Sequence, residues 1–109
     1  MRPMDFRKVL AIIAKAAKRG ETVKIYYPKT DLSPAGWREV EPYSLSTDIG
    51  RAGEHLVYGE DLLSPGHILN GYSVERAKNH CDSFIVGKIK SARPTGKKFT
   101  SRANWKVEF

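Results

Sequence analysis

The sequence is poor in the features that define several classes of protein. Its single cysteine, Cys81, cannot form a disulfide within the chain, so the fold does not depend on an oxidising compartment. No apolar run approaches the roughly 18 residues of a membrane-spanning helix. The short apolar segment near the N-terminus is interrupted by Lys15, which makes it a poor signal peptide. We therefore expect a cytoplasmic protein that makes no contact with a membrane.

Catalytic and metal-binding motifs are missing as well. The sequence contains no phosphate-binding Walker loop, no Gly-x-Ser-x-Gly motif and no dinucleotide fingerprint. Its histidines lie far apart, and the cluster His80, Cys81 and Asp82 has no second pair of ligands at zinc spacing. On an extended chain His80 would point away from Cys81 and could not activate its thiol. We predict a protein without enzymatic activity, bound metal or cofactor.

Charge is unevenly distributed along the 109 residues, which are enough for one domain spanning residues 1–109. Residues 1–29 carry eight lysines and arginines against two acids, residues 30–87 carry four against nine, and residues 88–109 carry seven against one. If the two basic ends meet in space, the domain gains a positive face that can attract a polyanion. The alternative is that the excess charge only keeps a small protein soluble.

The N-terminal segment has the signals of an amphipathic helix over about residues 5–19. Asp5 is a good N-cap, Gly20 ends the segment after two basic residues, and apolar residues recur at helical spacing between them. The apolar stripe should pack on the rest of the domain while the charged residues face water. Several alanines give the helix little bulk for insertion into a membrane surface, which argues against an anchor.

Two strands are expected next, joined by a long hairpin loop over residues 29–36. Residues 22–27 alternate, with Val23, Ile25 and Tyr27 on one face, which predicts a half-buried strand. Residues 37–43 predict the second strand, with Val40 facing inward. Pro42 lacks a backbone donor, so we expect it at a sheet edge, a strand end or a bulge.

Later segments predict further short strands and therefore a mainly β fold. Strands are expected at residues 55–59, 72–74 and 84–90, with a bulge at Gly87 and a turn at Thr95 and Gly96. Residues 60–71 fit either a loop with a helical turn or an irregular strand. One helix and about five strands favour a small five-stranded β-barrel, with the helix packed against an end or an open side.

Four blocks of the sequence, in order, resemble the WYL domain. They are residues 23–27, residues 38–45 with the pattern Arg-x-Val-x-Pro-x-x-Leu, residues 53–58 and residues 83–89. The resemblance covers about residues 22–92 and leaves 93–109 as a basic C-terminal strand or tail. It implies an SH3-like or Sm-like small barrel of the kind found in bacterial transcription regulators, where it is thought to sense ligands, commonly nucleic acid, through a basic and aromatic pocket.

The departures from the family pattern bear on the site. The naming Trp-Tyr-Leu is replaced by residues 55–57, and two family arginines are replaced by Ile85 and Lys88. Carried over by resemblance, the polar site rests on Arg38 and Lys88, with Tyr43 and His55 as neighbours. The alternative for Arg38 is a surface ion pair with one of the neighbouring glutamates, Glu39 or Glu41. No helix-turn-helix accompanies the barrel, so the resemblance implies a stand-alone module, of a kind a phage or mobile element could encode.

The basic C-terminal segment is a second candidate site for nucleic acid. Its cations alternate with aromatic rings, a mixture that suits single strands because charges follow phosphates and rings stack on bases. The candidate residues are Lys90, Arg93, Lys97, Lys98, Arg102 and Trp105. The alternative is a closing strand in which residues 105, 107 and 109 fill the core and the lysines stay outside.

The leading functional hypothesis is a regulatory module that binds nucleic acid, with single-stranded DNA or RNA favoured, in transcription or defence regulation. A second hypothesis is a protein-interaction or oligomerisation module that docks on a host protein through strand edges and Trp37. A third is a sensor that binds a small molecule or nucleotide in the barrel pocket.

Overall fold

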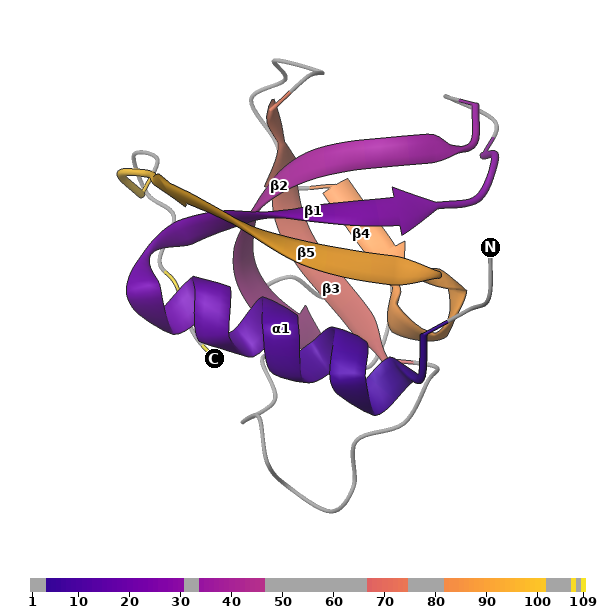
Figure 1. Cartoon of the computed structure of the whole chain (residues 1–109), viewed down its shortest axis with the longest axis horizontal. Coiled ribbons are helices and arrows are strands. Elements are labelled where there is room, and N and C mark those ends of the chain that lie inside the picture. The colour runs from indigo at the N-terminus through magenta and orange to yellow at the C-terminus, as the bar shows by residue number, and fades with distance from the viewer. Residues whose placement is uncertain (1–3, 31–33, 47–66, 75–81, 102–106, 108) are drawn as a thin grey trace.

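The computed structural model describes residues 4–30, 34–46, 67–74, 82–101, 107 and 109. Within them an N-terminal helix is followed by five antiparallel strands that form one sheet in the order β4-β3-β2-β1-β5 (Figure 1). The elements are α1 (Phe6–Arg19), β1 (Glu21–Tyr27), β2 (Gly36–Ser46), β3 (Ile68–Ser73), β4 (Asp82–Ile85), the 3-10 helix η2 (Val86–Lys88) and β5 (Ser91–Lys98). The predicted fold class, a small mainly β domain with five strands and one N-terminal helix, is confirmed.

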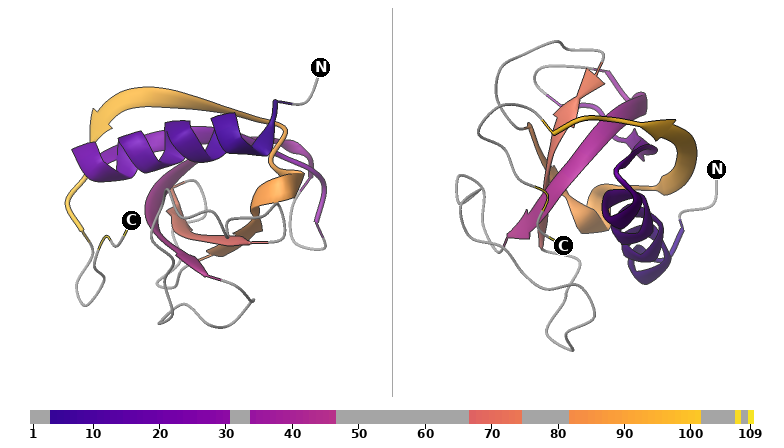
Figure 2. Two further views of the ribbon diagram at one scale, coloured as in Figure 1. Left: turned by 90° about the horizontal axis from the view of Figure 1, so that it is seen from below. Right: turned by 90° about the vertical axis from the view of Figure 1, so that its left-hand side faces the viewer.

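The sheet is strongly curved, and the core lies on its inner face, where α1 packs. Figure 2 shows β2 and β3 bending around the interior, while α1 lies along β5 and β1. The apolar stripe of α1 joins the inward residues of the strands in one buried cluster. This cluster comprises Val9, Leu10, Ile13, Ala16, Val23, Ile25, Tyr27, Val40, Leu45, Leu69, Phe84, Val86, Ile89 and Ala92.

The helix begins and ends as the sequence predicts. The Asp5 carboxylate accepts a hydrogen bond from the backbone N–H of Arg7 at 2.8 Å, which satisfies one donor of the first turn. Gly20 adopts a left-handed conformation with φ of 66°, and its N–H bonds the carbonyl oxygens of Ala16 and Ala17. The basic residues of α1 are exposed, so its charged side faces solvent.

Replacing Asp5 by alanine is expected to lower the free energy of unfolding by about 1 kcal/mol, because the cap of α1 is lost. Chemical denaturation of both proteins measures the difference. Asp5→Asn retains an acceptor at the same position and serves as the matched control, with a much smaller loss expected. Equal losses in the two variants would show that the side-chain cap contributes nothing.

Pro42 sits in a bulge within a central strand. β2 pairs with β1 on one side and β3 on the other, and its register with β3 shifts between Pro42 and Ser44. The proline is fully buried. At a bulge the hydrogen-bond pattern between the strands is interrupted, so no N–H is needed from Pro42. The predicted bulge is therefore confirmed, and the predicted sheet edge is wrong.

Two predicted features near the C-terminal half are wrong. The strand expected at 84–90 ends at Ile85, and Gly87 lies in η2 instead of a bulge. The reason is topological: β4 and β5 lie at opposite edges of the sheet, so the chain must turn between them. The turn expected at Thr95 and Gly96 is also absent, because β5 runs through it with Gly96 at φ of 77° and a register shift against β1.

The remaining strand predictions divide into two groups. The undecided segment 60–71 contributes its last residues to β3 (Ile68–Ser73), which also takes in most of the strand expected at 72–74. The strand expected at 55–59 lies outside the described residues. No helix in the described part of the chain is long and apolar enough to cross a membrane.

Candidate nucleic-acid interface

The two basic ends of the sequence lie side by side in the fold. β5 pairs with β1 and packs against α1, so residues from the first and last segments share one part of the surface (Figure 1). Backbone hydrogen bonds fix the two ends of this contact, from Met4 N–H to the Lys90 carbonyl oxygen (2.8 Å) and from Phe99 N–H to the Gly20 carbonyl oxygen (2.9 Å). The two basic ends therefore meet in space, which is the condition stated above for a positive face.

Three lysines surround one hollow at an end of the sheet. Lys29 follows β1, Lys88 ends η2 and Lys90 precedes β5, and all three are exposed. The hollow has a volume of about 400 Å³. Its other lining residues are Met4, Pro28, Gly87 and Ile89. We call this space the lysine hollow. Because none of its described lining residues is acidic, its chemistry suits an anion such as a phosphate.

Arg38 is a packed cation on the inner face of the sheet. Its guanidinium carbon lies 5.3 Å from the ring centroid of Tyr27 and 5.9 Å from that of Phe84. The two rings meet edge to face at 5.2 Å, and one guanidinium nitrogen donates to the Pro34 carbonyl oxygen at 3.1 Å. The residue is 8% exposed. These contacts hold the guanidinium in one orientation, with its charge facing aromatic rings.

The WYL resemblance places Lys88 and Tyr43 beside Arg38, but in the structure both lie away from it. Lys88 lines the lysine hollow, whereas Arg38 does not. Tyr43 lies five residues further along β2, up to about 16 Å away at the usual strand rise of ~3.3 Å per residue. Its ring packs on Phe99 at 5.7 Å and its hydroxyl donates to Glu41 at 2.8 Å. His55 lies outside the described residues.

The alternative for Arg38, a surface ion pair with a neighbouring glutamate, does not fit its position. Arg38 is buried, and strand alternation directs Glu39 and Glu41 to the opposite side of β2. There Glu39 meets Lys97, and Glu41 accepts from a tyrosine hydroxyl. A surface pair is therefore not the role of this arginine.

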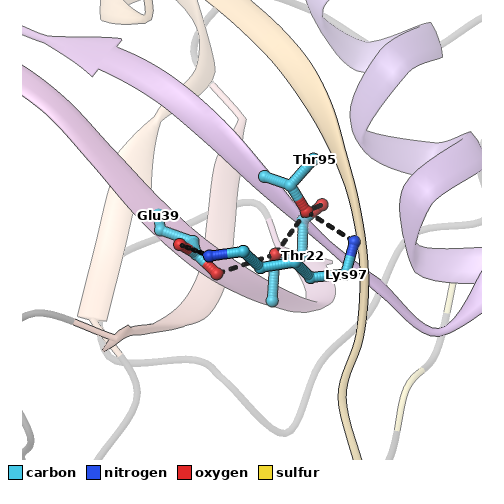
Figure 3. A network of polar contacts seen from close by, with 4 residues as sticks. All are labelled: Thr22, Glu39, Thr95 and Lys97. Carbon is cyan, nitrogen blue, oxygen red and sulfur yellow. Dashed lines mark hydrogen bonds and ion pairs between the residues drawn. The ribbon is translucent and has the colours of Figure 1, made fainter.

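Lys97 belongs to a polar network on the outer face of the sheet (Figure 3). Its ammonium lies 3.5 Å from the Glu39 carboxylate, which also accepts from the Thr22 hydroxyl at 3.0 Å. The Thr95 hydroxyl lies 2.6 Å from that of Thr22 and accepts from the Lys97 N–H at 3.0 Å. The network ties the irregular end of β5 to β1 and β2, and it matches the charge of Lys97 with that of Glu39.

Lys98 is also engaged. Its ammonium lies 3.6 Å from the Glu21 carboxylate and donates to the Arg19 carbonyl oxygen at 2.6 Å. Both lysines at the end of β5 thus have carboxylate partners inside the protein. Exposed pairs of this kind are weak, at about 0–1 kcal/mol, so they reduce the availability of these charges without abolishing it.

Arg93 has a different environment from the other cations of β5. Its guanidinium carbon lies 4.9 Å from the ring centroid of Trp37 on β2. Trp37 in turn meets the ring of Tyr26 on β1 edge to face, at 5.5 Å. The exposed side of three adjacent strands therefore carries two aromatic rings and a stacked cation.

The aromatic residues of the C-terminal segment that are described are packed against the protein. Phe99 contacts Tyr43, and Phe109 packs against the core cluster. The position of Phe109 therefore agrees with the alternative in which residues 105, 107 and 109 fill the core. Arg102 and Trp105 lie outside the described residues. No group of three or more potential metal ligands occurs among the residues that the structure describes.

Sequence reasoning did not assign Lys24, Tyr26, Lys29 or Trp37 to the nucleic-acid site. Alternation along residues 22–27 does place Lys24 and Tyr26 on the outer face, so the signal was present for both. Trp37 was considered only as an anchor for a protein partner. Its proximity to Arg93 depends on the order of strands, which neither residue's local sequence encodes.

Comparison with known proteins gives a likeness of fold. No protein-family model matches the chain, and no curated protein matches it in sequence. Among solved structures, the fold is similar to part of the proteasome accessory factor B/C (PafBC) of Arthrobacter aurescens, with a TM-score of 0.64 and 13% sequence identity. The match covers 95% of this chain and 14% of that protein. At this identity the likeness shows a shared fold.

Proposed function

We propose that this chain is a WYL-like regulatory module without enzymatic activity that binds nucleic acid, with single-stranded DNA or RNA favoured. Under this proposal it acts in the cytoplasm in transcription or defence regulation and is encoded by a phage or mobile element. The resemblance of four sequence blocks to WYL domains supports this proposal. The fold is also similar to part of PafBC.

The lysine hollow is the observation that carries the binding proposal. Lys29 follows β1, whereas Lys88 and Lys90 flank Ile89 between η2 and β5, and the three surround one space with no acid among its described lining residues. Among the described residues none of the three forms an ion pair, so their charges are not matched within this part of the protein. Lysines act as flexible point charges and can follow phosphates without a fixed geometry. A polyanion backbone is the ligand that best matches this arrangement.

Arg38 contributes differently under this proposal. Its guanidinium is oriented by two aromatic rings and the Pro34 carbonyl oxygen, and only 8% of the residue is exposed. A guanidinium held in this way ties β2 to Tyr27 of β1 and Phe84 of β4. We therefore assign the backbone contacts to the lysine hollow and give Arg38 a positioning role.

Replacing Lys88 and Lys90 together by glutamine is expected to weaken binding to every oligonucleotide and to flatten its salt dependence. Each phosphate contact contributes about 0.7 to the slope of log affinity against log salt for single strands. The double variant should therefore lose about 1 to 2 from the slope of the unaltered protein. Electrophoretic mobility shifts with single- and double-stranded oligonucleotides at several salt concentrations measure both quantities.

A matched control removes the same charge from the far end of α1. Lys15 and Arg19 are exposed and lie in the last two turns, roughly 13 to 20 Å beyond the helix start at a rise of ~1.5 Å per residue. Lys15→Gln with Arg19→Gln should change the slope by less than the hollow variant does. Equal effects would mean that net charge alone drives binding. If no oligonucleotide shifts in mobility with the unaltered protein at low salt, the nucleic-acid function is wrong.

A further inference from the structure

The outer face of β1, β2 and β5 exposes a large aromatic side chain in an ordered setting. Trp37 is 36% exposed, an unusual state for a tryptophan in a small domain. It stands at the start of β2, opposite Tyr26 on β1 in the strand register. The ring is held between Tyr26 at 5.5 Å and the Arg93 guanidinium at 4.9 Å. The aromatic surface is therefore preorganised and need not be assembled by a ligand.

The charge on this face favours an anionic partner. The strand register places Lys24 between Glu39 and Arg93 in one row across the sheet. Glu39 is engaged with Lys97 and the Thr22 hydroxyl, which leaves two cations beside the aromatic rings. Among the described residues neither Lys24 nor Arg93 forms an ion pair with a carboxylate. Two unmatched positive charges next to the exposed ring of Trp37 and the half-buried ring of Tyr26 form a combination that suits single-stranded nucleic acid.

This aromatic face adjoins the segments that carry the lysine hollow. The Tyr26 carbonyl oxygen accepts the N–H of Lys90 at 2.9 Å, and Ser91 pairs with Tyr26 in the sheet. Lys29 follows two residues after the end of β1. A single-stranded nucleic acid that crosses Trp37 therefore comes close to the lysine hollow. One bound molecule can place its bases on the rings and its phosphates at the lysines.

We propose that Tyr26, Trp37 and Arg93 form a stacking surface for an unpaired base, while the lysine hollow holds the adjacent phosphates. The proposal rests on the proposed nucleic-acid function and explains how single strands are preferred. In a duplex the faces of the bases are covered by their neighbours, so a duplex can offer only its backbone to this surface. An unpaired base stacks on an aromatic ring or on the plane of a guanidinium.

Replacing Trp37 by alanine is expected to weaken single-strand binding by about 5- to 150-fold, the usual range for loss of one stacked base. Duplex binding at the same salt concentration should change by less than about twofold, because phosphate contacts are retained. The slope of affinity against salt should also stay unchanged for single strands. Competition between a fluorescent oligothymidylate and an unlabelled duplex of equal length measures both affinities.

Two companion variants separate stacking from charge and from folding. Trp37→Phe retains a ring and should keep most of the single-strand affinity. Lys15→Gln removes one charge from the exposed side of α1 and should leave the preference for single strands unchanged. Circular dichroism and thermal unfolding show whether Trp37→Ala remains folded, which is expected because this side chain is partly exposed.

Fluorescence gives a direct readout of the contact. The chain contains two tryptophans, so the variant Trp105→Phe leaves Trp37 as the single tryptophan, which is excited selectively over the tyrosines. Titration with oligothymidylate should quench this emission with the same midpoint as the binding curve. Unchanged emission at saturation would place the bases elsewhere and overturn the stacking proposal.

The outcomes distinguish this proposal from the function on which it rests. If Trp37→Ala binds single strands normally while Lys88→Gln with Lys90→Gln does not, the stacking surface is wrong and the nucleic-acid function stands. If the unaltered protein binds no oligonucleotide, both fail. Equal losses for single strands and duplexes would also overturn stacking. A protein partner captured by the unaltered chain and lost with Trp37→Ala, without any nucleic-acid binding, would assign this face to protein recognition.

Discussion

Replacing Leu69 by alanine is expected to lower the free energy of unfolding by about 2–5 kcal/mol. Leu69 lies in β3, is fully buried, and pairs with Leu45 on β2 and Phe84 on β4. Removing its side chain leaves a cavity in the middle of the core cluster, where strands on both sides restrict relaxation. Because small domains have a total stability of only about 5–15 kcal/mol, a large share of it would be lost.

Urea denaturation of the unaltered protein and of Leu69→Ala measures the difference in the free energy of unfolding. An unchanged slope of that free energy against urea concentration shows that only stability has changed. Val74 directly follows β3 and is 39% exposed, so Val74→Ala is the matched control from the same segment. The control should change the free energy of unfolding by no more than about 0.5 kcal/mol. A loss below about 1 kcal/mol for Leu69→Ala would show that β3 does not pack in the core as described.

Replacing Gly71 by alanine should destabilise the protein by about 1–3 kcal/mol or more through overpacking. A Cβ at this position would lie 2.5 Å from Cγ1 of Val40 and 2.9 Å from the carbonyl oxygen of Glu41. Val40 is fully buried, and the carbonyl belongs to the backbone of β2, so neither can move aside easily. The strand pairing of β2 with β3 would have to open near the Pro42 bulge.

Gly36 provides the control for this substitution. It lies in β2, the strand that pairs with β3, and a Cβ there would meet no atom of the described residues within 4 Å. Gly36→Ala is therefore expected to change the midpoint of thermal unfolding little, whereas Gly71→Ala lowers it clearly. Similar midpoints for the two variants would contradict the close approach of β3 to β2.

Local signals explain which parts of the fold were predictable. The limits of α1 follow from Asp5 and Gly20, which act on the backbone next to them. The strand at residues 22–27 follows from alternation of apolar residues, and β1 spans Glu21–Tyr27. Both depend on neighbours within a few positions, so one sequence contains the information.

The extension of β2 beyond Tyr43 could not be predicted in this way. Ser44 and Ser46 are polar yet buried, because the Asn70 side chain on β3 donates to both hydroxyls, at 3.2 and 3.1 Å. From sequence alone, a serine is assigned to the surface or to a turn unless its hydrogen-bond partner elsewhere in the chain is known. The same reasoning applies to η2, whose position depends on β4 and β5 lying at opposite sheet edges.

The candidate site was predicted in part for the same reason. Lys88, Lys90 and Arg93 were expected to bind nucleic acid, and they lie in or beside the surfaces proposed above. Arg38 and Tyr43 were expected to be neighbours, yet they contact different aromatic residues. The residues that complete the site come from strands brought together only by tertiary pairing.

The pairing of β1 with β5 also has a consequence for the order of folding. The hydroxyl of Thr95 bonds the backbone of Thr22 across 73 positions, whereas only residues 28–35 separate β1 from β2. Closing so long a loop is slow compared with forming a hairpin. The β1–β2 hairpin can therefore form early, with one edge of β1 unpaired and open to other chains until β5 docks.

Docking of β5 would then be the step that completes both the fold and the binding surface. It brings Arg93 to Trp37 and places Lys90 beside Tyr26, so neither contact exists in the hairpin alone. A partly folded chain would have the aromatic rings without the cation stacked on them. Under the proposed function, only molecules in which the two ends of the domain have joined would bind the ligand.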